Sequence, residues 1–181
     1  ARRAVTLLRD RNALLPVAGK RTVVIQYMPE TELRAGRALA ATLRAIDPRT
    51  RVVKISPSTA ASQLEALAPL MAGAERVVLA AFVRRIEGEG RPAIPPHIAD
   101  WMAQAAAADS ASAQPRLVFV AFGNPYLLRQ VPAVGSYLVT FGVGDALERA
   151  AAEALTGRIR ITGTTPVSLP GFFARGDGLG R

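Results

Sequence analysis

The sequence has 181 residues, half of them apolar and a fifth charged, which is the composition of a globular protein with one buried core. Its 23 basic residues outnumber 14 acidic ones, but the arginines are scattered and no run of five basic residues occurs, which argues against nucleic-acid binding. No apolar run reaches the roughly 18 residues of a membrane-spanning helix. The absence of cysteine excludes disulfides and thiolate metal sites.

Five short runs rich in β-branched residues predict strands along the chain. They are almost continuously apolar rather than alternating, which is typical of strands buried on both faces of a parallel sheet. Helical patterns separate them and supply the crossovers that a parallel sheet requires. The predicted strands are residues 22–26, 51–55, 76–81, 116–121 and 136–141.

The first helical pattern is the clearest of the set. Thr31 is a suitable N-cap, and Asp47-Pro48 ends the pattern because the residue before proline disfavours helical geometry. Its apolar stripe consists of Ala35, Leu39, Leu43 and Ile46.

Three further helices are expected. One contains residues 64–71 and ends at Gly73, and another follows the prolines at 95–96. The last opens on Asp145 with Glu148 three residues later, the spacing of a capping box, and ends before Gly157. Residues 105–115 are expected to be a loop, residues 158–162 a short strand, and the Gly- and Pro-rich remainder extended coil.

This alternation of strands and helices predicts a three-layer α/β/α sandwich with a mostly parallel sheet of five or six strands. In such folds ligands bind at the carboxyl ends of the strands. One of these loops carries Gly142 and Gly144 before a helix, the setting of a dinucleotide loop, but the third glycine is missing. A tight turn before a capped helix explains the two glycines equally well.

The loop at residues 84–91 is the longest and most charged of the strand-end loops. Glycoside hydrolysis needs two carboxyl groups, and Glu87 or Glu89 on this Gly-flanked loop is a candidate acid reaching into a neighbouring domain. The alternative is that both are solvated charges paired with nearby arginines. Arg84 and Arg85 are candidate contacts for a sugar hydroxyl, acetamido or carboxylate group.

The remaining polar candidates have simpler explanations. His97 is the single histidine and begins a helix, so a surface or capping role is expected and a histidine metal site is not. Asn124, followed by proline, is a helix-starting turn and also a candidate substrate contact, because it ends a strand. No cofactor or metal is expected.

Three segments in order resemble the second, C-terminal domain of glycoside hydrolase family 3. Residues 6–16 (TLLRDRNALLP) resemble the segment that enters that domain. Residues 122–126 (FGNPY) resemble its strand-end GNPY turn. Residues 150–157 followed by 164–170 (TTPVSLP) resemble its closing pattern. The resemblance assigns residues 1–18 to a linker and residues 19–181 to the sandwich domain.

The resemblance implies a (β/α)₈ barrel upstream in the same polypeptide, carrying the aspartate nucleophile of a retaining mechanism. This chain alone is then expected to be inactive, with the barrel as its partner and a carbohydrate as substrate. The loop of β-glucosidase-like members, E-G-x-D-R, is matched only in part by residues 87–91 (EGEGR), which lack the aspartate. Residues 84–90 and the closing 170–179 (PGFFARGDGL) are more similar to the β-N-acetylhexosaminidase branch, which favours an amino-sugar substrate. A bacterial parent, periplasmic or secreted rather than cytoplasmic, is favoured.

The alternative hypothesis is a stand-alone module that binds a sugar or a nucleotide at the strand ends without catalysis. The same fold class hosts many functions, so the fold does not decide between the two.

Overall fold

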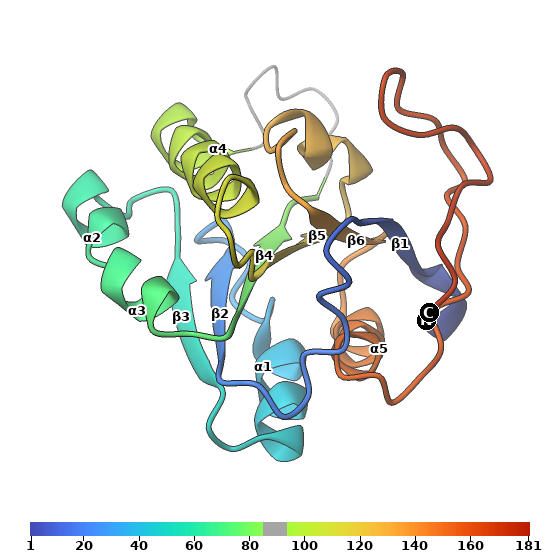
Figure 1. The fold of residues 1–181 in the computed structure, drawn as a ribbon, viewed down its shortest axis with the longest axis horizontal. Helices are drawn as coiled ribbons and strands as arrows, with labels where there is room; N and C mark the ends of the chain where they lie inside the picture. Colours follow the sequence, from blue (N-terminus) through green and yellow to red (C-terminus); the bar gives the residue numbers. More distant parts are fainter. Residues whose placement is uncertain (85–93) are drawn as a thin grey trace.

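A mostly parallel sheet runs through the centre of the molecule, with helices on both of its faces (Figure 1). The computed structural model describes residues 1–84 and 94–181. Within these residues the sheet has six strands, in the order β1-β6-β5-β4-β2-β3. The strands are β1 (Val5–Asp10), β2 (Thr22–Tyr27), β3 (Arg51–Ile55), β4 (Arg76–Phe82), β5 (Leu117–Phe122) and β6 (Ser136–Thr140).

The five predicted strands are all present, and they pair in parallel. Every residue of β2, β5 and β6 is buried, which explains why these runs are apolar at successive positions rather than at alternate ones. β3 lies at an edge, and most of its residues are at least partly exposed.

The helices divide between the two faces of the sheet. Side chains of α1 (Arg37–Ile46) and α5 (Asp145–Leu155) share one apolar core with the sheet. The other core holds side chains of α2 (Ala61–Glu65), α4 (Pro96–Ser110) and the 3₁₀ helix η2 (Pro125–Arg129), with α3 (Ala68–Ala72) packed against it. This division confirms the predicted three-layer sandwich.

Residues 1–18 contribute a strand of their own. They begin with a 3₁₀ turn, η1 (Arg2–Ala4), and continue as β1, which pairs antiparallel with β6 at the edge of the sheet. Leu14 and Val17 are then buried against α5 and its neighbours. This segment is therefore part of the sandwich, and a linker role for it stays a prediction.

The first helix begins later than predicted. Thr31 is exposed and does not cap it, because α1 starts at Arg37 with Gly36 as its N-cap. Gly36 has a positive φ of 77°, which favours glycine over residues with a Cβ. The stripe residues Leu39 and Leu43 are buried as expected.

The prediction for residues 64–73 was wrong in extent, because the segment forms two short helices, α2 and α3. The loop predicted at 105–115 was also wrong in part, since α4 continues to Ser110. Alanine is the strongest helix former, and residues 105–108 are all alanine. Asp109 then accepts hydrogen bonds from the backbone N–H groups of Arg116 and Leu117, at 2.9 and 3.1 Å, which closes the connection to β5.

The C-terminal tail, residues 158–181, pairs with itself and with β1 instead of forming the predicted strand at 158–162. Ile161 and Arg181 exchange backbone hydrogen bonds of 2.7 and 3.2 Å, and Leu179 donates to the Leu7 carbonyl at 2.7 Å. Leu169 and Phe173 are buried in the core shared with α4. The tail therefore covers the outer edge of β1 (Figure 1).

Candidate functional site

Two neighbouring strands at the middle of the sheet send their connections to opposite faces. β2 leads to α1 on one face, whereas β4 leads to α4 on the other, and the two strands are paired. In doubly wound sheets, ligands bind beyond the carboxyl ends of such a pair. The candidate site therefore lies at the ends of β2 and β4, flanked by the ends of β3 and β5.

An ion pair bridges the two strand ends. Arg84 Nε lies 2.9 Å from Glu32 Oε1, and the two side chains are 57% and 27% exposed. Arg84 follows β4, whereas Glu32 belongs to the connection between β2 and α1. The Arg84 guanidinium is thus already paired with the Glu32 carboxylate, and a sugar carboxylate would have to compete with Glu32 for it.

A second polar cluster lies at the ends of β2 and β3. Ser56 Oγ lies 3.4 Å from Glu30 Oε1 and 2.9 Å from Ser58 Oγ. The Thr59 carbonyl lies 3.1 Å from His97 Nε2, which ties this loop to the start of α4. The expected surface role of His97 is confirmed, since its ring is exposed and bonded only to backbone among the described residues.

Tyr27 ends β2 directly beneath these loops. Its side chain is 1% exposed, and burial, with a smaller contribution from the Glu30 carboxylate, raises the pKa of its hydroxyl to about 12. Tyr27 therefore belongs to the apolar core at the end of β2, and its hydroxyl should ionise only at a higher pH than that of an exposed tyrosine.

Asn124 is the turn residue that the sequence predicted. Its Oδ1 accepts a hydrogen bond of 2.9 Å from the backbone N–H of Tyr126 and so caps η2. Tyr126 itself is 41% exposed at the same edge of the sheet. A substrate contact by Asn124 stays a prediction.

Of the other predicted site residues, Arg85, Glu87 and Glu89 lie outside the described residues. Arg84 and Asn124 follow the carboxyl ends of β4 and β5, which lie side by side because the two strands are parallel neighbours. The sequence predicted a site at the carboxyl ends of the strands. It gave no local indication of the Arg84–Glu32 ion pair, because the two residues are 52 positions apart.

A buried carboxylate, Glu148, occupies the N-terminus of α1 instead of capping its own helix as predicted. Glu148 is 1% exposed, and its oxygens accept hydrogen bonds from the backbone N–H groups of Gly36, Ala38 and Leu39 at 3.1, 3.0 and 3.1 Å. The predicted capping box on α5 was wrong, because this side chain crosses to a neighbouring helix. Helix N-termini stabilise anions through such N–H groups, and here the protein supplies its own anion.

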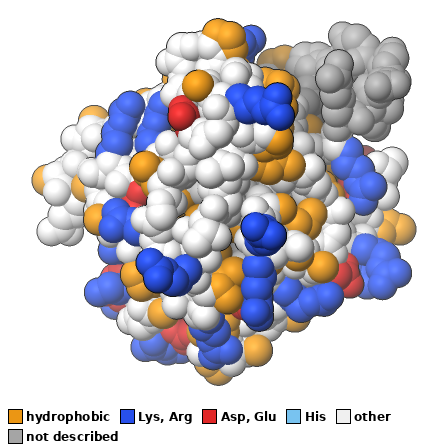
Figure 2. All heavy atoms as spheres, turned by 90° about the vertical axis from the view of Figure 1, so that its right-hand side faces the viewer, with side chains coloured by type: hydrophobic (Ala, Val, Ile, Leu, Met, Phe, Trp, Pro, Cys, Tyr) orange, Lys and Arg blue, Asp and Glu red, His pale blue; other side chains and the backbone are white. Residues whose placement is uncertain are grey.

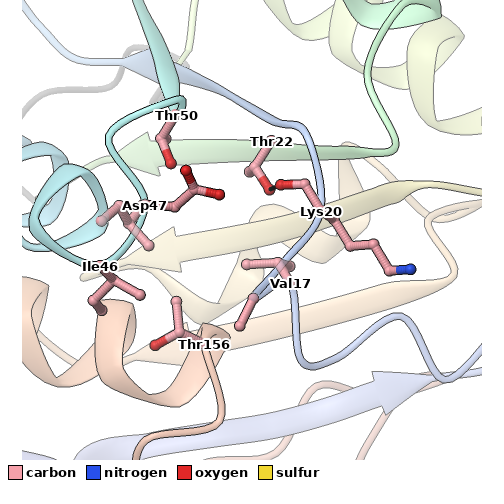
Figure 3. Close-up of a pocket in the computed structure, with 9 residues that line it drawn as sticks. Val17, Lys20, Thr22, Ile46, Asp47, Thr50 and Thr156 are labelled. Atoms are coloured by element: carbon pink, nitrogen blue, oxygen red, sulfur yellow. Dashed lines mark hydrogen bonds between the residues drawn. The ribbon is translucent and has the colours of Figure 1, made fainter.

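A shallow hollow lies at the amino ends of β2 and β3, opposite the carboxyl ends that form the candidate site (Figure 3). Its volume of about 10 Å³ is roughly that of one water molecule, which is too small for a sugar. In Figure 3 the Lys20 amine extends away from the Asp47 carboxylate. The hollow is lined by Val17, Ala18, Lys20, Thr22, Leu43, Ile46, Asp47, Thr50 and Thr156.

Within residues 1–84 and 94–181, no group of three or more His, Cys, Asp or Glu side chains is arranged to hold a metal ion. No helix in those ranges has the length and apolarity to cross a bilayer.

No protein-family model and no curated protein sequence matches the chain. A solved structure of a glycoside hydrolase family 3 β-N-acetylglucosaminidase from Paenibacillus does, with a TM-score of 0.72 and 18% identity over 88% of this chain and 29% of that one. The chain has the fold of part of a family 3 glycoside hydrolase.

Two further structures share this fold. A fungal multi-domain family 3 β-N-acetylglucosaminidase matches with a TM-score of 0.68 and 18% identity, over 96% of this chain and 19% of that one. A β-glucosidase from Listeria innocua matches with a TM-score of 0.65 and 18% identity, over 88% of this chain and 24% of that one. The chain thus spans less than a third of the length of these family 3 and related enzymes, which is consistent with their C-terminal domain.

Proposed function

We propose that this chain is the C-terminal accessory domain of a family 3 glycoside hydrolase whose upstream (β/α)₈ barrel carries the nucleophile. The observation that carries the proposal is the match of nearly the whole chain to less than a third of larger glycosidases. The order of the three sequence segments that resemble the family supports it independently.

We further propose that the parent enzyme is a β-N-acetylhexosaminidase acting on amino-sugar glycans. The two β-N-acetylglucosaminidases have TM-scores of 0.72 and 0.68, compared with 0.65 for the β-glucosidase and 0.60 for a β-glucoside phosphorylase. The sequence of residues 84–90 favours the same branch. In this proposal Arg84 and Asn124 lie on the side of the domain that faces the carbohydrate, and Arg85 is a candidate contact on sequence grounds.

The nucleotide-binding alternative has little support at the end of β2. Doubly wound nucleotide-binding folds place a phosphate at a helix N-terminus next to the strand ends. At α1 that position is filled by the Glu148 carboxylate, which already accepts three backbone N–H groups. A phosphate there would meet a buried negative charge, which argues against a nucleotide at this position.

The proposal is tested by assaying the longer polypeptide that contains this chain on two chromogenic substrates, an aryl N-acetyl-β-glucosaminide and an aryl β-glucoside. The two substrates are compared by kcat/KM, and we expect the higher value for the N-acetyl-β-glucosaminide. Preference for the glucoside would contradict the branch, and hydrolysis of neither substrate would contradict the family.

The position of the catalytic acid is tested in the same polypeptide with Glu87→Gln and Glu89→Gln. If the acid comes from the barrel, both variants keep kcat/KM within a few-fold of the parent. A loss of about 10²-fold or more in either variant would place the acid on this loop, because general acid catalysis contributes factors of that size.

A further inference from the structure

Charge is distributed unevenly between the two helical layers. In the layer of α2, α3, α4 and η2, residues 55–75 and 94–115 hold four acidic residues and no Lys or Arg, and η2 adds one arginine, Arg129. The opposite layer, formed by η1, α1 and α5, carries five exposed arginines, and we call it the basic layer. They are Arg2, Arg3, Arg37, Arg44 and Arg149.

The acidic residues on these same elements do little to neutralise the arginines. Glu148 is buried under the N-terminus of α1, and Glu153 bonds Arg2, with Nε 3.0 Å from Oε2. Asp145 is left as the exposed acidic residue of η1, α1 and α5. The surface of the basic layer is therefore positive.

The arginines of the basic layer differ from arginines with structural roles elsewhere. Arg9 donates to the carbonyls of Pro132 and Val134, and Arg116 donates to those of Ala72 and Ala74, so both fasten loops. In contrast, four guanidinium groups of the basic layer make no hydrogen bond or ion pair within the described residues. They are those of Arg3, Arg37, Arg44 and Arg149.

The surface between these arginines suits an extended polyanion better than a protein partner. The exposed positions beside them on α1 and α5 are alanines at 41, 45 and 146, which leave the surface flat. The large exposed apolar side chains of the described residues, which a protein interface would use as anchors, lie on other segments. They are Leu33, Tyr126, Phe172 and Leu179.

The side of the molecule where β1, α5 and the tail lie is also rich in basic residues. Figure 2 shows Lys and Arg side chains over most of this face, more of them in its lower half, with Asp and Glu side chains between some of them. Guanidinium groups bind carboxylates and phosphates in a planar, bidentate manner, which favours a ligand with repeated anionic groups.

We propose that the basic layer binds an anionic glycan, a polysaccharide with carboxylate or phosphate groups along its length. The choice of a glycan among polyanions rests on the proposed function, whereas the binding of a polyanion rests on the charges alone. Such a surface would hold an anionic polymer beside the enzyme while the catalytic barrel cleaves its amino-sugar linkages.

The test measures binding of this chain to hyaluronan, whose repeat contains one carboxylate and one N-acetylglucosamine. Uncharged N-acetylglucosamine oligomers and duplex DNA are measured in parallel. We expect hyaluronan to bind at low salt and to be released at about 1 M salt, where the Debye length falls to about 3 Å. The neutral oligomers should not show this salt-sensitive binding.

A matched pair of variants locates the binding surface. Arg44→Gln with Arg149→Gln removes two positive charges from the basic layer, and Lys54→Gln with Arg129→Gln removes two from β3 and η2. We expect hyaluronan affinity to fall about tenfold in the first variant and less than about twofold in the second, since exposed ion pairs contribute up to about 1 kcal/mol each.

Three outcomes would overturn the proposal. The first is that hyaluronan shows no salt-sensitive binding. The second is that the two double variants lose equal affinity for hyaluronan. The third is that duplex DNA binds but hyaluronan does not. Because none of these measurements involves hydrolysis, a failure here is distinguishable from a failure of the glycosidase assignment.

Discussion

Replacement of Glu148 by alanine is expected to destabilise this protein more than the same replacement of Asp145 or Glu153, the other acidic residues of α5. The carboxylate is 1% exposed and accepts three backbone N–H groups at the start of α1, two of them on buried residues. A hydrogen bond to a charged group contributes about 1.5–3 kcal/mol, and a buried donor left without a partner costs about 1–3 kcal/mol. Loss of the bonds from the two buried donors, Gly36 and Leu39, should therefore cost about 3–6 kcal/mol, whereas the partly exposed N–H of Ala38 can bond to water instead.

That loss is a large fraction of the roughly 5–15 kcal/mol that stabilises a typical domain. Glu148→Gln should lose about half as much, because the amide keeps one acceptor oxygen and points an N–H₂ group at one of the remaining donors. Urea unfolding followed by circular dichroism gives both values.

Glu153→Ala is the matched control on the same helix. Glu153 bonds the exposed Arg2 at the surface, and its side chain is 27% exposed, so its removal should cost less than about 1 kcal/mol. A cost below about 1 kcal/mol for Glu148→Ala, equal to that of the control, would refute the reasoning that this carboxylate caps α1.

Three other perturbations test separate features of the fold. Gly36→Ala should lower the free energy of unfolding in urea clearly more than Gly19→Ala does. Both glycines have φ near 77°, but a Cβ at Gly36 would lie 2.6 Å from the buried Gln26 Oε1, whereas a Cβ at Gly19 meets nothing within 4 Å. Equal losses in the two variants would contradict this overlap. Burial raises the pKa of Tyr27 to about 12, so the contribution of this residue to stability should be full below about pH 10 and fall by about 2–3 kcal/mol as the pH rises to 12. Burial also raises the pKa of Tyr137, which adds to the fall, so Tyr27→Phe should remove only part of it. An unchanged slope in Tyr27→Phe would argue against the Tyr27 contribution. Arg181 Nη2 lies 3.0 Å from the buried Asp10 Oδ2, in an ion pair not aligned as a hydrogen bond. Arg181→Gln should therefore lower the free energy of unfolding by about 1–3 kcal/mol at neutral pH, and by much less in an Asp10→Asn background. Additive losses in this double-mutant cycle would contradict a stabilising ion pair.

Much of the fold follows from local patterns in the sequence. The parallel strands were predicted because each is a short apolar run that the sheet buries on both faces, and this pattern does not depend on distant residues. The turn at Asn124 was predicted for the same reason, since its side chain caps a backbone N–H only two residues away.

The features that the sequence did not reveal depend on long-range contacts. The start of α1 is set by Glu148, a residue more than a hundred positions away, and Thr31 was the better cap on local grounds alone. The tail pairs Ile161 with Arg181 and Leu179 with Leu7, so its order comes from partners that the strand period at 158–162 does not specify. The same limit applies to the Arg84–Glu32 pair at the candidate site.

The most direct test of the central claim is hydrolysis of an aryl N-acetyl-β-glucosaminide by residues 1–181 alone and by the full polypeptide that contains them. The account predicts no turnover by the isolated chain, even when circular dichroism shows it folded, and turnover by the full polypeptide. Turnover by the isolated chain, or a full polypeptide that contains no glycosidase barrel, would contradict the account.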